Sequence, residues 1–279
     1  MASSNASTSS LGALAGKLVL VGAGKMGGAM LAGWLAGGLQ PRQAVVIEPM
    51  PSDELTALAA RGVQVNPTGA GPAAAILIAV KPQGAADAMA KLGPMVGPQT
   101  VAVSIMAGRP LAFLEHNLPA GTAAVRAMPN TPAAIGRGVT VAVANARVSA
   151  AQRDLAHQLL AATGAVEWVT DEALMDAVTA VSGSGPAYVF LLAVALAKAG
   201  VAAGLPPELA ARLARETVAG SGELLHRSPL DAAVLRQNVT SPGGTTAAAL
   251  GVLMAEPGLQ ALLDRAIDAA TQRSRELAG

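Results

Sequence analysis

Four continuous apolar runs of strand length, separated by small-residue helical stretches, constrain the fold of this chain more than any other feature. The runs are Leu18 to Val21, Ala44 to Glu48, Ile76 to Val80 and Val101 to Ile105. Runs without polar alternation are typical of strands that are covered on both faces. Candidate helices lie between them at residues 26–36, 53–61 and 85–92. This order predicts an α/β fold with a doubly wound parallel sheet.

The pattern changes near residue 170. Shorter runs at 123–126, 140–143 and 166–170 could extend the sheet, but after Asp171 the strand signal disappears. The rest of the chain is predicted to be helical, with breaks at 183–186, 204–207, 228–229 and 241–244. We therefore expect three segments, which are a disordered lead-in over 1–16, an α/β domain over 17–170 and an all-α domain over 171–279.

Composition excludes several classes of function. The chain has 279 residues, 52% of them hydrophobic, which is enough for a large core in one or two domains. A net charge of +1 gives no broad attraction for nucleic acid or an anionic membrane. The absence of cysteine excludes disulfides and thiol chemistry and fits a cytoplasmic protein. His116, His157 and His226 are too scattered for a histidine metal site, so we predict no metal.

The most apolar later segment, residues 187–205, has nearly the length of a membrane span. Lys198 and several glycines interrupt it, and no anchoring residues flank it. We predict a helix buried on all sides, at a subunit interface, and no membrane partner. The first sixteen residues lack the charged start and apolar stretch of a secretory signal.

A glycine-rich turn, Gly22-Ala23-Gly24-Lys25-Met26-Gly27, follows the first apolar run and opens a helix. In such a turn Gly22 makes the tight bend, Gly24 lets a pyrophosphate approach the backbone, and Gly27 lets the helix pack on the strand. The helix N-terminus adds N–H groups and a partial positive charge. The turn predicts a dinucleotide site, the alternative being a glycine turn without a ligand.

An acidic residue, Glu48, ends the second apolar run. A carboxylate there can accept hydrogen bonds from a ribose 2′-hydroxyl but repels a 2′-phosphate, which favours NAD(H) over NADP(H). A plain solvated acid at a strand end remains an alternative.

A second anion-binding site is predicted at Ser241-Pro242-Gly243-Gly244-Thr245-Thr246. Unshielded backbone N–H groups and two hydroxyls lie there, at the start of a predicted helix. An ordinary capped helix start is the alternative. The turns 79–83, 104–108, 126–132 and 181–188 are further candidates, each of which could line a pocket or serve packing alone.

Taken together, the motifs GAGKMG, AVKPQ, AMPNTP, AVSGSGPAY and SPGGTT closely resemble those of pyrroline-5-carboxylate reductases, in order, from Lys17 to the C-terminus. The resemblance implies an N-terminal Rossmann-type domain joined to an all-α C-terminal domain that forms a homodimer, in some members assembled into rings. It also implies hydride transfer from NADPH or NADH to the C=N carbon of 1-pyrroline-5-carboxylate, giving L-proline in the last step of proline biosynthesis.

The resemblance also implies site residues. It implies cofactor contacts by Val21, Gly22, Ala23, Gly24, Lys25, Met26, Ala79, Val80, Lys81, Pro82, Ile105, Met106, Ala107 and Asn238. It implies substrate contacts by Glu172, Gly244, Thr245 and Thr246, with the Thr246 hydroxyl on the ring nitrogen. Two departures concern the cofactor. Glu48 replaces a small or hydroxylated residue of NADPH-preferring members, and in the short segment 62–75 only Asn66 could replace a cofactor-binding asparagine.

Two other functions are compatible with parts of the pattern. A β-hydroxy-acid dehydrogenase would want a lysine in the cleft, but Lys198 is the only lysine after residue 91 and lies in the apolar helix. A non-catalytic dinucleotide-binding regulator would not need a carboxylate-binding site. No histidine lies in a motif, which suits an imine, because a protonated C=N is already electrophilic and needs mainly positioning. We expect the Thr246 hydroxyl to orient the protonated imine.

Overall fold

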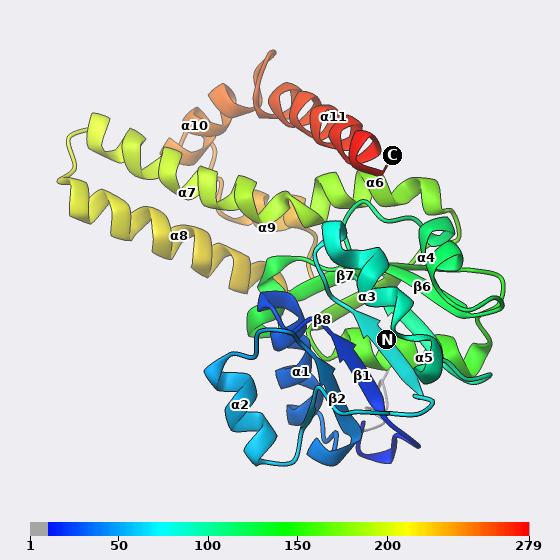
Figure 1. The fold of residues 1–279 in the computed structure, drawn as a ribbon. Helices are drawn as coiled ribbons and strands as arrows, with labels where there is room; N and C mark the ends of the chain where they lie inside the picture. The colour runs from blue at the N-terminus through cyan, green and yellow to red at the C-terminus, as the bar shows by residue number, and fades with distance from the viewer. Residues whose placement is uncertain (1–10, 279) are drawn as a thin grey trace. The chain divides into compact units, whose positions relative to one another are not determined.

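The computed structural model describes residues 11–278, and the chain divides into two units (Figure 1). The first holds Met1–Gly183 and Gln272–Gly279, and the second holds Ser184–Thr271. The chain enters the second unit at Ser184, later than the boundary predicted near residue 170.

An eight-stranded sheet forms the centre of the first unit. Its strands are β1 (Leu18–Val21), β2 (Ala44–Ile47), β3 (Gln64–Val65), β4 (Ala75–Ile78), β5 (Val101–Ser104), β6 (Ala123–Met128), β7 (Gly138–Ala144) and β8 (Gly164–Trp168). The order is β3-β2-β1-β4-β5-β6-β7-β8, and every neighbouring pair is parallel except β6 and β7. The chain builds outward from β1 in one direction and then from β4 in the other, so the direction of winding reverses between these two strands. This confirms the doubly wound sheet, and the antiparallel β7 is a departure from a purely parallel one.

Helices cover both faces of this sheet. They are α1 (Lys25–Ala36), α2 (Asp53–Ala60), α3 (Ala85–Ala90), α4 (Leu111–Asn117), α5 (Ala150–Ala161) and α6 (Met175–Val178). Short 3-10 turns are η1 (Leu11–Ala13), η2 (Pro41–Gln43), η3 (Pro82–Gly84), η4 (Gly93–Met95), η5 (Thr131–Ile135) and η6 (Glu172–Leu174), and η7 (Thr179–Gly183) is a π-helical segment. The sequence prediction missed β3, α4 and α5. The start of α5 has a signature, because Ser149 and Gln152 form a capping box.

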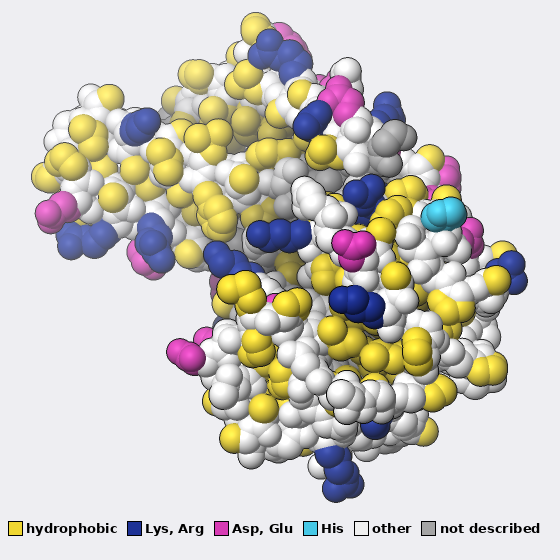
Figure 2. Space-filling model, viewed as in Figure 1, with side chains coloured by type: hydrophobic (Ala, Val, Ile, Leu, Met, Phe, Trp, Pro, Cys, Tyr) yellow, Lys and Arg dark blue, Asp and Glu magenta, His cyan; other side chains and the backbone are white. Residues whose placement is uncertain are grey.

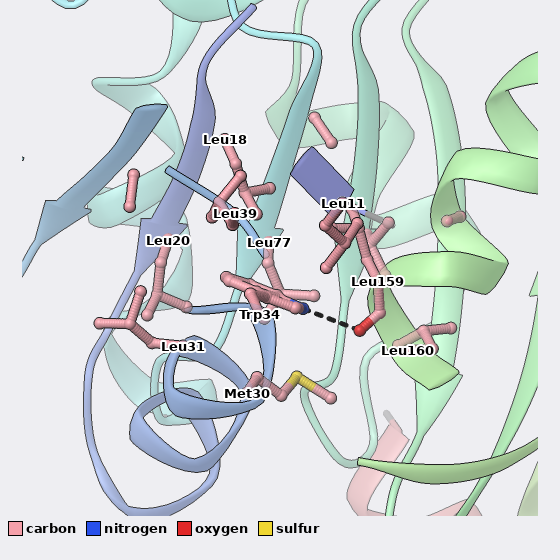
Figure 3. Packing of buried hydrophobic residues seen from close by; sticks show 14 of the residues in the cluster. Leu11, Leu18, Leu20, Met30, Leu31, Trp34, Leu39, Leu77, Leu159 and Leu160 are labelled. Atoms are coloured by element: carbon pink, nitrogen blue, oxygen red, sulfur yellow. Dashed lines mark hydrogen bonds between the residues drawn. The ribbon is translucent and has the colours of Figure 1, made fainter. Parts of the chain in front are cut away.

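An apolar layer packs against each face of the sheet, because successive side chains of each strand point to opposite faces. Leu18 and Leu20 of β1 pack in the layer of α1 and α5, whereas Val19 and Val21 pack in the layer of α3 and α4. Trp34 of α1 is fully buried in the first layer, where its Nε1 donates to the Leu159 carbonyl oxygen of α5 at 2.8 Å (Figure 3). That bond satisfies the only polar group of the indole.

The predicted disordered lead-in does not hold for residues 11–16, and residues 1–10 lie outside the described part. Leu11, in η1, is 5% exposed and packs in the layer of α1, and Leu14 contacts the same layer. Two apolar side chains within four residues are enough to hold this segment against the core.

The second unit is helical, which confirms the all-α C-terminal region. It contains α7 (Gly185–Ala202), α8 (Pro207–Arg227), α9 (Ala232–Asn238), α10 (Thr245–Leu253) and most of α11 (Leu259–Ala278). Three of the four predicted breaks, at 204–207, 228–229 and 241–244, separate these helices, and a further break, at 254–258, was not predicted. The predicted break at 183–186 lies where the π-helical segment η7 leads into α7. The end of α11 returns to the first unit, where Ser274 is 6% exposed and its Oγ donates to Asp176 Oδ1 at 2.7 Å.

The prediction that the apolar helix is buried on all sides is wrong for the single chain. Phe190 and Leu191 of α7 are 65% and 66% exposed, and hydrophobic side chains crowd the surface of the α7–α8 pair (Figure 2). One helix packed beside α7 cannot surround it. Residues 172–202 are also long and apolar enough to cross a membrane by length and composition, with a mean hydropathy of 1.7.

Candidate functional site

The glycine turn after β1 is built so that only glycine fits at two of its positions. Gly22 has φ of +90°, and a Cβ there would lie 2.8 Å from the Ala79 carbonyl oxygen. A Cβ on Gly27 would collide with the carbonyl oxygen of Gly22. Gly24 differs, because no described atom outside its own neighbours lies within 4 Å of its Cβ position. The turn is therefore closely packed at Gly22 and Gly27 and open at Gly24.

The open position is the N-terminus of α1. Gly24 is its N-cap, and no side chain of the described residues caps it. The N–H groups of the first turn thus remain available for an external acceptor, and the helix dipole favours an anion there. A pyrophosphate fits this place both sterically and electrostatically.

A cleft of about 610 Å³ opens at this helix end, at the carboxyl ends of the central strands. The glycine turn and the predicted turns 79–83, 104–108 and 126–132 meet in it, with Gly183 from the turn 181–188. It is lined by Gly24, Lys25, Met26, Ala79, Val80, Lys81, Pro82, Ile105, Met106, Ala107, Met128, Pro129, Asn130, Thr131 and Gly183. Every residue predicted at 79–82 and 105–107 is present, and the turn at 126–132 contributes four residues. The cleft lies where the winding of the sheet reverses, which is where open α/β sheets bind ligands.

The charges of the cleft suit a phosphate-containing ligand. Lys25 and Lys81 are among the lining residues, and no carboxylate occurs among the described residues that line it. The other lining side chains are mostly apolar, as the flat ring of a nicotinamide requires on its face.

Glu48 is held against the glycine turn by its backbone donors. Its Oε2 accepts from the Ala23 N–H at 2.8 Å and its Oε1 from the Met50 N–H at 3.0 Å. Asn66 fixes the backbone of Glu48, because its Oδ1 accepts from the Glu48 N–H and its Nδ2 donates to the Glu48 carbonyl oxygen, both at 2.9 Å. Asn66 itself has φ of +49°, a conformation that asparagine tolerates. The carboxylate is therefore a fixed negative charge beside the turn.

Glu172 joins three separate segments of the first unit. Its Oε1 accepts from the Leu111 N–H at 2.7 Å and from the Arg126 guanidinium at 2.9 Å. The side chain of Arg126 is 7% exposed and that of Glu172 is 30% exposed, so the ion pair is largely shielded from water. The sequence prediction placed Arg126 at the start of the turn 126–132 but did not predict its ion pair with Glu172, although an arginine inside an otherwise apolar strand is a signal of a buried partner.

The second predicted anion-binding site lies at the N-terminus of α10, in the second unit. Gly243 has φ of +69°, Gly244 is the N-cap, and Thr245 and Thr246 are the first two helical residues. No side chain of the described residues caps this helix either. A Cβ on Gly244 would lie 2.6 Å from Ser241 Oγ and 3.2 Å from the Ser241 carbonyl oxygen, so a larger residue there would require Ser241 to shift. Asn238 is the last residue of α9 and is exposed.

Among the described residues, no group of three histidine, aspartate or glutamate side chains is placed to hold a metal ion.

Two family models match the chain. The model of pyrroline-5-carboxylate reductase dimerisation matches residues 172–277, and that of NADP oxidoreductase, coenzyme F420-dependent, matches residues 17–108. The first match includes α7 and α8, so their exposed apolar surface belongs to a dimerisation region. The second match covers the glycine turn and the turns 79–83 and 104–108, all of which line the cleft, in keeping with use of a nicotinamide cofactor.

Relatives cover nearly the whole chain. A pyrroline-5-carboxylate reductase of Pseudomonas aeruginosa is 41% identical over 94% of this chain and 97% of its own. One of Mycobacterium tuberculosis is 40% identical over 94% and 96%. The solved pyrroline-5-carboxylate reductase of Coxiella burnetii is similar with a TM-score of 0.87 and 33% identity, over 95% of this chain and 99% of that one. Identity of this extent, along the α/β and helical regions alike, places the chain in the pyrroline-5-carboxylate reductase family.

Proposed function

We propose that this protein reduces 1-pyrroline-5-carboxylate to L-proline with hydride from NADH or NADPH, the last step of proline biosynthesis. The observation that supports this best is the cleft in which the glycine turn and the loops after β4 and β5 meet, in a chain of this family. Neither alternative fits. A regulator would not need the second anion-binding site, and Lys198, the lysine that a β-hydroxy-acid dehydrogenase would need, is an exposed residue of α7.

The residues of the cleft would hold the cofactor in a defined direction. The N–H groups at the start of α1, with Lys25, would hold the pyrophosphate. Glu48, beyond the glycine turn at the end of β2, would accept from the adenosine ribose. The nicotinamide would then extend to the loops 79–82 and 105–107 after β4 and β5. When bound, the reduced nicotinamide supplies the hydride.

The α10 N-terminus would hold the substrate. We assign the backbone N–H groups of Gly244 and Thr245 as donors to a carboxylate, in the manner of an anion at a helix end. The Gly244 N–H also donates to the Ser241 carbonyl oxygen at 3.1 Å, so it would be shared between the two acceptors. We assign to the Thr246 hydroxyl a hydrogen bond with the ring nitrogen, where it orients the protonated imine and takes part in proton exchange. Asn238 is proposed as a cofactor contact from the same helical unit.

Glu172 is proposed to act near the substrate through its second oxygen. Its Oε1 is already engaged by the Leu111 N–H and Arg126, so this carboxylate is held in one orientation.

The fixed carboxylate of Glu48 makes NADH the better cofactor in our proposal. A 2′-phosphate would approach a charge that cannot swing away, because both of its oxygens accept backbone hydrogen bonds. We further propose a cytoplasmic homodimer in which a second copy covers the apolar surface of α7 and α8. A mass measurement in solution separates a dimer from a ring of dimers.

Steady-state reduction of 1-pyrroline-5-carboxylate with each cofactor tests the proposal. We expect turnover with both and a higher kcat/KM with NADH. A β-hydroxy acid with NAD⁺ serves as the control substrate and should not be oxidised. Cofactor binding without turnover of 1-pyrroline-5-carboxylate would contradict the proposed reaction.

A further inference from the structure

Arg109 connects the two loops on the nicotinamide side of the cleft. It follows the loop 105–107, and its Nη2 donates to the carbonyl oxygen of Pro82, in the loop after β4, at 3.1 Å. Both loops line the cleft, but Arg109 itself does not. Any effect of Arg109 on the cofactor therefore passes through Pro82.

The guanidinium of Arg109 is held in place by α4. Its Cζ lies 4.7 Å from the centre of the Phe113 ring, a cation–π contact that orients the planar group. Its Nε is buried and has no hydrogen-bond partner among the described residues. An unpaired buried N–H is unfavourable. The arrangement nevertheless keeps the guanidinium where it reaches Pro82.

The acceptor, Pro82, controls the shape of its loop. Its carbonyl oxygen also accepts from the Ala85 N–H, which closes the turn η3 before α3. One oxygen thus receives two donors, one from within its own turn and one from the opposite loop. Without the Arg109 donor, no hydrogen bond would join the two loops at this point, and their separation would not be fixed there.

We propose that Arg109 is a positioning residue for the nicotinamide half of the cofactor, an inference that rests on the proposed NAD(P)H-dependent function. It holds the loop 79–82 against the loop 105–107 and so fixes the width of the site where the nicotinamide lies. Hydride transfer depends on the distance between the reacting carbons, and a misplacement of about 1 Å can cost about a hundredfold in rate. The adenosine half, beside Glu48, does not depend on this link.

Binding of NADH and of ADP-ribose to the full-length Arg109→Met variant tests the proposal. ADP-ribose shares the adenosine and pyrophosphate of NADH but lacks the nicotinamide. We expect the Kd of NADH to rise about tenfold, or about 1.4 kcal/mol, while the Kd of ADP-ribose stays within twofold. The kcat should fall as well. Equal changes for both ligands, or no change for NADH, would overturn the proposal.

Arg153→Met is the matched control, because Arg153 makes the same kind of contact elsewhere, 4.4 Å from the centre of the Trp168 ring. It should leave both Kd values unchanged, and an equal rise for NADH in this variant would count against a specific role of Arg109. If Arg109→Met does not fold, Arg109→Gln decides by the same comparison, since glutamine keeps a polar side chain but lacks the guanidinium that reaches Pro82. Turnover of 1-pyrroline-5-carboxylate by the wild type tests the proposed function separately, because neither binding measurement requires that substrate.

Discussion

Replacing Glu48 by serine should shift the cofactor preference toward NADPH. The carboxylate of Glu48 is fixed by the N–H groups of Ala23 and Met50 at 2.8 and 3.0 Å. A bound 2′-phosphate cannot avoid it by pushing the side chain into solvent without breaking both bonds. Serine removes the charge and keeps a short polar side chain.

The size of the shift follows from two contributions. Two unit charges about 5 Å apart repel by roughly 3 kcal/mol at an effective dielectric constant near 20 and by less than about 1 kcal/mol in water. Glu48 is half-buried, so a value between these limits, about 1–2 kcal/mol, is reasonable. Loss of a hydrogen bond to the NADH ribose adds about 1 kcal/mol. The ratio of kcat/KM for NADPH to that for NADH should therefore rise about 30- to 150-fold.

The assay is steady-state reduction of 1-pyrroline-5-carboxylate with each cofactor at low and at high ionic strength. The shift should shrink at high salt, because part of it is a screened repulsion. Glu54→Ser is the control, since it removes the same charge from an exposed site in the first turn of α2 and should change the ratio less than threefold. A ratio that stays within twofold of the wild type in Glu48→Ser would refute the assignment of Glu48 to the adenosine ribose.

Three further substitutions test separate parts of the molecule. Thr246→Ala should lower kcat/KM for 1-pyrroline-5-carboxylate about 10- to 100-fold with the Kd of NADH unchanged, and wild-type kcat/KM would remove Thr246 from the mechanism. Gly27→Ala should abolish NADH binding in a titration, because its Cβ would collide with the Gly22 carbonyl oxygen, whereas Gly28→Ala, whose Cβ meets Ala23 O at 3.6 Å, should bind normally. Trp34→Ala should lower the free energy of unfolding in urea by about 3–5 kcal/mol, and a loss under about 1 kcal/mol would contradict the packing around it.

Much of the α/β unit follows from patterns along the sequence. The apolar runs located β1, β2, β4 and β5 to within two residues, because strands buried on both faces leave a continuous apolar signal. The two-residue β3 leaves no such signal, since Gln64 and Val65 are only half-buried at the sheet edge. Local signals are thus strong where burial is complete and weak at the edges.

The cleft was predictable in part, for a different reason. Motifs at the ends of parallel strands meet at one edge, which placed loops 79–82 and 105–107 beside the glycine turn. The bonds of Arg109 to Pro82 and of Glu172 to Arg126 join residues 27 and 46 positions apart. No periodicity marks such pairs, and only the folded chain brings them together. The exposed apolar surface of α7 likewise depends on how few helices of its own unit pack against it.

The return of the C-terminal residues to the first unit has a practical consequence for making fragments of this protein. Because Gln272–Gly279 belongs with Met1–Gly183, the helical unit is an insertion within the α/β unit rather than a tail attached to it. A fragment that stops after residue 183 would leave Asp176 without the hydroxyl of Ser274 and would expose the surface that the last turns of α11 cover. An independently expressed dinucleotide-binding fragment should therefore be made by joining residue 183 to residue 272 through a short linker.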